Sequence, residues 1–109
     1  MGETDGTQPL AVDLFGMVEV AEGGIVSKTI VEDQRLKLVH FSFAPGQELS
    51  EHTASVPATI HILRGSGTVR LGDRTYDAQP GSLFYMPAEL RHAVQATGEL
   101  VFLLTMFRS

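Results

Sequence analysis

Apolar and polar positions alternate along this chain in short stretches that turn residues separate. Val69 and Leu71, for example, alternate with Thr68 and Arg70. Further stretches of this kind lie at residues 25–31, 36–43, 49–54, 58–63, 75–78, 82–86, 92–96 and 100–107. No stretch of twelve residues keeps the spacing i, i+3, i+4, i+7 that an amphipathic helix needs. Many short strands with turn signals about 8–12 residues apart predict an all-β sandwich or barrel.

The length of 109 residues predicts one domain, which we place at residues 10–109. Residues 1–9 are mainly polar or glycine, and we expect them to form a flexible N-terminal tail. The chain has no cysteine, so neither disulfides nor thiolate metal sites can form.

The charge of the chain argues against several classes of partner. Thirteen acidic residues outnumber eight basic ones, which are scattered, so we expect neither a nucleic-acid nor a membrane partner. The longest strongly apolar run, Leu100 to Leu104, is too short to cross a bilayer, and the acidic, polar start of the sequence leads us to expect no secretion signal. We therefore expect a cytoplasmic protein.

Two segments, Gly46 to Gly65 and Gly81 to Ala96, share one plan. Each opens with a glycine turn and carries a histidine, His52 or His92, near a short apolar run. Their spacing resembles the two signature motifs of the cupin superfamily. The positions that match the motifs are Gly46, His52, Gly65, Gly81, Pro87 and His92. The resemblance implies a double-stranded β-helix, or jelly-roll barrel, of the RmlC-like kind.

Four other positions depart from the pattern of the superfamily. Ala54 and Ala58 stand where the first motif has its second histidine and its glutamate, both usual metal ligands. Glu89 and Ala96 replace the glycine and the asparagine of the second motif.

The resemblance implies that His52 and His92 point into the barrel, and we take them as candidate ligands of a divalent metal. Zinc, nickel, iron or manganese would suit imidazole donors, but two histidines alone hold such an ion weakly. Strand parity places His61 on the face opposite Ile60 and Ile62, so it can join the site only if a bulge after Pro57 reverses the strand.

The two alanines also predict a larger and more apolar pocket. We expect it to be lined by Ala54, Ala58, Ile60, Ile62 and Val94, and to suit a mainly apolar small molecule oriented by the histidines. Three hypotheses remain open. They are a small-molecule-binding cupin with at most a labile metal, a metal-dependent enzyme of the dioxygenase or isomerase type, and a structural module without a working pocket.

Two further expectations concern surfaces and the remaining histidine. Leu100 to Phe107 is apolar on both faces, which one sandwich cannot cover, so we expect a homodimer. The apolar phase slips within residues 36–43, so His40 can face either way, and we expect a half-buried strand histidine.

Overall fold

The computed structural model describes residues 5–108, and within them it has seven β-strands and one short 3₁₀ helix. The elements are η1 (Phe15–Met17), β1 (Ile25–Glu32), β2 (Leu36–Phe43), β3 (Glu48–His52), β4 (Ala58–Leu71), β5 (Arg74–Ala78), β6 (Leu83–Met86) and β7 (His92–Phe107). All strand pairs are antiparallel. No helix in the part of the chain described here is long and apolar enough to cross a membrane.

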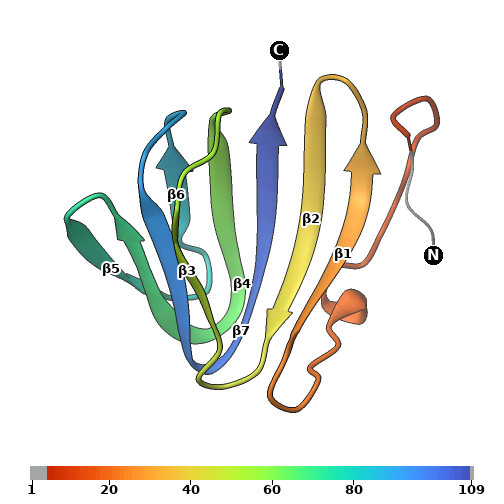
Figure 1. Ribbon diagram of the computed structural model, residues 1–109. Helices are drawn as coiled ribbons and strands as arrows, with labels where there is room; N and C mark the ends of the chain where they lie inside the picture. Colours follow the sequence, from red (N-terminus) through yellow and green to blue (C-terminus); the bar gives the residue numbers. More distant parts are fainter. Residues whose placement is uncertain (1–4, 109) are drawn as a thin grey trace.

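Two long strands, β4 and β7, bend so that each contributes to both walls of the barrel (Figure 1). In one wall, the C-terminal half of β7 pairs with β2 and the N-terminal half of β4 pairs with β6, and β1 extends this wall beyond β2. In the facing wall, the N-terminal half of β7 pairs with β3 and the C-terminal half of β4 pairs with β5. We call these the β1–β2–β6 wall and the β3–β5 wall. The prediction of an all-β jelly-roll barrel is confirmed.

The glycines at 65 and 67 do not interrupt β4, although the sequence pattern divides the strand there. A Cβ at Gly65 would collide with the carbonyl of Glu99, and one at Gly67 would collide with the carbonyl of Gln95. Gly65 also has a φ of +98°, which favours glycine. The two strands therefore continue through the bend, with register shifts beside these glycines, because their backbones can approach closely there.

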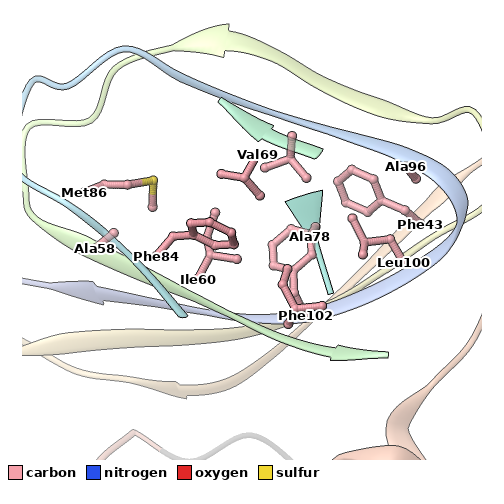
Figure 2. Close-up of a cluster of buried hydrophobic side chains, with 12 residues drawn as sticks. Phe43, Ala58, Ile60, Val69, Ala78, Phe84, Met86, Ala96, Leu100 and Phe102 are labelled. Carbon is pink, nitrogen blue, oxygen red and sulfur yellow. The ribbon is translucent and has the colours of Figure 1, made fainter. Parts of the chain in front are cut away.

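The interior between the walls is filled by apolar side chains. Phe43 and Phe102 are fully buried, with ring centroids 5.3 Å apart. Figure 2 shows Phe84 and Met86 of β6 in the same cluster. The alternating pattern of the sequence thus produces one apolar layer shared by both walls, and its burial is the main stabilising contribution.

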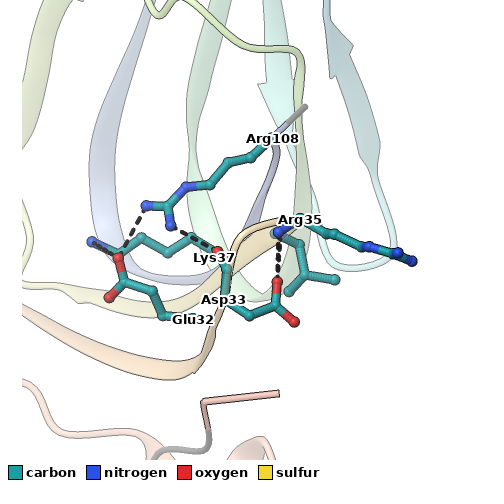
Figure 3. A network of polar contacts seen from close by, with 6 residues as sticks. Glu32, Asp33, Arg35, Lys37 and Arg108 are labelled. Carbon is teal, nitrogen blue, oxygen red and sulfur yellow. Dashed lines mark hydrogen bonds and ion pairs between the residues drawn. The ribbon is translucent and has the colours of Figure 1, made fainter. Parts of the chain in front are cut away.

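The C-terminal end of β7 is fastened to the β1–β2 turn by Arg108. Its guanidinium donates to the carbonyl of Asp33 at 2.9 Å and to the carboxylate of Glu32 at 3.0 Å (Figure 3). The carboxylate of Asp33 accepts hydrogen bonds from the amides of Arg35 and Leu36, which shapes the turn.

The N-terminal part of the chain is only partly covered by these elements. Residues 5–9 are exposed, residues 1–4 of the expected tail lie outside the described residues, and flexibility of the tail stays a prediction. Residues 10–24 contain η1 and no strand, and Met17 is their buried side chain.

Candidate functional site

His52 and His92 lie side by side on the inner face of the β3–β5 wall. His52 ends β3 and His92 begins β7, and the two residues are cross-strand partners. Their ring centroids are 4.2 Å apart with an interplanar angle of 60°. Leu71 of β4 is the partner of His92 on its other side. The pair therefore comes from strands whose register brings them together.

The two rings are exposed to different extents. His92 is 7% exposed, and Val94 and Ala96, which share its face, are each 1% exposed, as strand parity predicts. His52 is exposed at the end of the barrel. The pair thus joins a buried imidazole to one that solvent can reach.

Backbone carbonyls fix the tautomer of both histidines. Nδ1 of His52 lies 2.9 Å from the carbonyl oxygen of Ser50, and Nδ1 of His92 lies 2.9 Å from that of Leu90. A carbonyl oxygen can only accept, so each Nδ1 carries the proton. Each neutral ring then keeps a lone pair on Nε2, and no hydrogen bond within residues 5–108 uses either Nε2 atom.

The environment of His92 favours its neutral form. Burial lowers the pKa of His92, and the nearby His52 lowers it further, while the hydrogen bond to Leu90 acts in the opposite direction. At neutral pH His92 is therefore an acceptor of hydrogen bonds or a ligand, not a cation.

Ala58 lies at the same end of the barrel as the histidines. It begins β4, and its cross-strand partners are Met86 and Met106, whereas His92 pairs with the last residue of that strand. Because β4 and β7 both bend midway, the start of β4 and the start of β7 lie toward the same, upper end of the barrel in Figure 1. Ala58 is 4% exposed, so its methyl group lies in the apolar interior.

The other expected pocket residues divide into two groups. Ile60, Ile62 and Val94 are buried in the apolar core, and whether they border a ligand pocket stays a prediction. Ala54 lies beyond β3, which ends at His52, so the expected strand over residues 49–54 is too long. Parity therefore does not place Ala54 on the face of His52, and its carbonyl instead accepts from the amide of Glu89 at 2.7 Å.

His61 and Glu51 are both kept apart from the histidine pair by the sheet itself. His61 is exposed between the buried Ile60 and Ile62, so it faces outward. Glu51 pairs with Arg70 at 2.8 Å, and Arg70 alternates with the buried Val69, so this ion pair also lies on the outer face. A polar groove of about 340 Å³ follows that outer face, lined by Glu48, Glu51, Thr68, Arg70 and Gln95 among others, and neither His52 nor His92 lines it.

The donor set at the site is limited to two imidazoles. No group of three or more His, Asp or Glu side chains able to hold a metal occurs among residues 5–108. Two Nε2 atoms fit a weakly held ion that completes its shell with water or a ligand, but they do not make a complete metal site.

His40 lies on the outer side of the β1–β2–β6 wall and is 1% exposed. The expected half-buried histidine is in fact fully buried, because residues 14–19 cover it. Sequence alternation could not show this, since the covering segment contains no strand.

Some contributions to the site are invisible to sequence motifs. The carbonyl oxygens of Ser50 and Leu90 orient the two rings, each from the residue two positions before its histidine. Any residue type supplies such an oxygen, so only the equal spacing offered a signal. Glu89 occupies the motif position of a glycine and has a φ of 69°, the left-handed region that strains a side chain with a Cβ.

Comparisons with known proteins place the chain in a family. The sequence model described as "Cupin domain" matches residues 39–107. The HTH-type transcriptional activator RhaR of Cronobacter sakazakii is 39% identical over 57 residues, which are 52% of this chain and 20% of that protein. The RhaR of Salmonella arizonae is 29% identical over 77 residues, 71% of this chain and 27% of that protein. The chain thus spans only about a quarter of the length of these curated relatives.

Solved structures agree with this assignment. A conserved Streptococcus pyogenes protein of unknown function superimposes with a TM-score of 0.85 at 27% identity, over 100% of this chain and 96% of that one. An RmlC-like cupin from Desulfovibrio desulfuricans gives a TM-score of 0.83 at 26% identity, over 92% of this chain and 97% of that one. With most of β2 to β7 matched by the family model and the whole fold matched by these structures, this chain belongs to the cupin superfamily.

Proposed function

We propose that this cupin binds a small, mainly apolar molecule at the end of the barrel where His52 and His92 meet. The observation that carries the proposal is the shared tautomer of the two rings, with both Nδ1 atoms donating to carbonyls and both Nε2 lone pairs free. Two adjacent acceptors favour a shared partner that brings positive charge or a proton. A ligand hydroxyl or amine, a water, or a divalent ion meets this need.

A metal would be held by Nε2 of His52 and of His92. A histidine that ligates a metal usually donates its other ring nitrogen to a carbonyl or carboxylate, and both rings have this arrangement. Zinc, nickel, iron or manganese would then keep open positions for a ligand oxygen or nitrogen. With no third protein ligand in the described part of the chain, the ion exchanges readily.

Two observations favour binding over catalysis. The site offers only two imidazole donors among the described residues, and the curated relatives are transcriptional activators. RhaR is named for transcriptional activation, and a barrel that resembles a fifth to a quarter of such a protein supports a role in binding. The neutral state of His92 further selects ligands that donate hydrogen bonds over carboxylates that can only accept them.

A second candidate is a structural module without a working pocket. The observation in its favour is the filled interior, where Phe84 and Met86 pack against Ala58 and Ile60 (Figure 2). On this alternative the histidine pair would bind nothing, and the outer face would carry the role of the protein.

Calorimetric titration with Zn²⁺ and Ni²⁺ at pH 7.5 tests the proposal on protein free of affinity tag and chelator. We expect weak binding to the parent, reduced at least tenfold in His52→Gln and in His92→Gln. His61→Gln is the matched control, since His61 is an exposed histidine on the outer face, and it should bind as the parent does. Equal binding in the parent and in folded His92→Gln would reject the metal site.

The ligand class is tested by NMR with phenol, benzylamine and benzoate as probes. Phenol and benzylamine, which donate hydrogen bonds, should shift the resonances of both histidines above pH 7, whereas benzoate should not. If none of the three probes shifts either ring and no metal binds, the structural module is the better account.

A further inference from the structure

Residues 14–19 form a strap across the outer face of β1 and β2, and three side chains of those strands bind its backbone. They are His40, which donates through Nε2 to the carbonyl of Leu14 (2.9 Å), Lys28, which donates to the carbonyl of Met17 (3.0 Å), and Ser42, whose hydroxyl accepts from the amide of Glu19 (3.2 Å). Met17 is 6% exposed, so the strap also buries an apolar side chain. In Figure 1 the strap is the orange segment with η1 beside β1.

His40 is the tether whose chemistry depends on pH. Because its Nε2 must donate to a carbonyl, the neutral ring leaves Nδ1 as an acceptor, and that atom is buried without a partner among residues 5–108. Protonation of Nδ1 would place a charged N–H group in a buried position where the backbone of His40 itself is the acceptor at hand. A buried charge without a counterion is costly.

We propose that His40 is a proton-sensitive latch, which holds the strap against β1 and β2 while it is neutral and releases it when it is protonated. The latch is separate from the histidine pair at the end of the barrel and does not depend on ligand binding there.

The charged groups around the ring do not offset this cost. Lys28, the cross-strand neighbour of His40 on β1, is a cation. Glu19 of the strap pairs with Lys28 at 3.0 Å, and Asp13, just before the strap, accepts from the amide of Phe15 at 3.1 Å. On the other side, β7 presents the uncharged Leu103.

These surroundings give the direction of the pH effect. Burial lowers the pKa of His40, and Lys28 lowers it further, while the hydrogen bond to Leu14 opposes both. With the strap released, the pKa returns toward about 6.5, the ordinary value. The closed form is therefore fully favoured above about pH 6.5, and its ratio to the open form falls by up to tenfold per pH unit until the lower pKa is reached.

Release of the strap would uncover an apolar part of the outer face. Val101 of β7 is fully buried on that face beside Ser42, and Met17 would leave its buried position. The expected consequence at mildly acidic pH is an opened N-terminal segment on an otherwise intact barrel.

Amide hydrogen exchange of Glu19, measured by NMR on the full chain and corrected for intrinsic rates, tests the latch. Between pH 7.5 and 5.0 we expect its protection to fall more than twofold in the parent. In His40→Gln it should change less than twofold, since a glutamine amide can donate to Leu14 without titrating. His61→Gln is the control and should retain the dependence of the parent.

Either of two results overturns the proposal. One is protection of Glu19 that is equal at both pH values in the parent, and the other is an equal loss in folded His40→Gln. If His40→Gln does not fold, the parent alone decides the matter through long-range ¹H–¹⁵N spectra of the His40 ring. The midpoint of its titration should lie at the lower end of the pH range over which Glu19 protection falls, and a midpoint at or above about pH 6.5 would reject the latch.

Discussion

Replacing Ala58 by glutamate should convert the histidine pair into a stronger metal site. Ala58 is 4% exposed on the inner face of β4, at the end of the barrel where His52 and His92 meet. The cupin pattern has a glutamate at this position, and a carboxylate would offset the charge of a divalent ion. The single substitution is the cleaner test, because Ala54 lies outside the strand and its direction does not follow from parity.

The expected gain and cost can both be bounded. Loss of one group that merely supports a ligand changes metal affinity by about 10–100-fold, so a third direct ligand should add at least this much. That gain corresponds to roughly 1.4–2.7 kcal/mol of binding free energy. Without metal, the carboxyl group would enter the interior between Met86 and Met106, where an unpaired polar group costs roughly 1–3 kcal/mol and overpacking a similar amount.

Titration calorimetry with Zn²⁺ and Ni²⁺, together with urea unfolding with and without metal, measures both quantities. Thr59→Glu is the matched control, because Thr59 is the next residue of β4 and faces outward with Tyr85 and Thr105. It should leave the affinity unchanged. Equal affinities for the parent and a folded Ala58→Glu variant would refute the placement of Ala58 beside the histidine pair.

Three further outcomes are expected. Leu83 and Tyr85 are 66% and 59% exposed on the outer face of β6, and we expect that face to form the interface of a homodimer. Light scattering should therefore give a dimer mass for the parent and a monomer mass for the variant in which both residues are replaced by lysine. A monomeric parent at micromolar concentration would contradict it. Glu89→Gly should raise the free energy of unfolding in urea by roughly 0.5–1 kcal/mol, because the gain from removing the left-handed strain at φ 69° exceeds the entropy cost of ordering a glycine. A loss of stability would show that the Glu89 side chain contributes more than the strain costs. Burial lowers the pKa of both His40 and His92, so the stability that their neutral forms contribute is complete above about pH 6.5. It is lost as pH falls from there through the lowered pKa values. A free energy of unfolding that stays constant down to pH 5 would contradict this.

The fold was predictable because its determinants are local or repeated. Alternation placed Ile60, Ile62 and Val94 on the inner face, and the turn residues separated most of the strands. At two positions the sequence pattern predicted a strand end that the structure does not have. Gly65 and Gly67 are typical strand breakers by composition, but here they permit β4 and β7 to approach closely at the bend. That role depends on a partner strand about thirty residues later in the sequence, which alternation cannot detect.

The site was predictable only in part. The motif spacing identified His52 and His92, and their adjacency follows from the β3–β7 register. The exposure of His52 and the position of Ala54 beyond β3 depend on where the strand ends, which is the least reliable part of a sequence-based assignment. The burial of His40 depends on a strap without periodicity, so it could not be inferred before the structure.

Long-range ¹H–¹⁵N NMR of the imidazole rings tests the central claim most directly, because it reports the tautomer and the state of each ring nitrogen. At pH 7.5 we predict that Nδ1 carries a proton in both His52 and His92, and that Zn²⁺ shifts both Nε2 resonances. The buried His40, with its proton on Nε2, should not respond to the metal. Protons on Nε2 of the pair, or Nε2 resonances that neither Zn²⁺ nor phenol moves, would contradict the account.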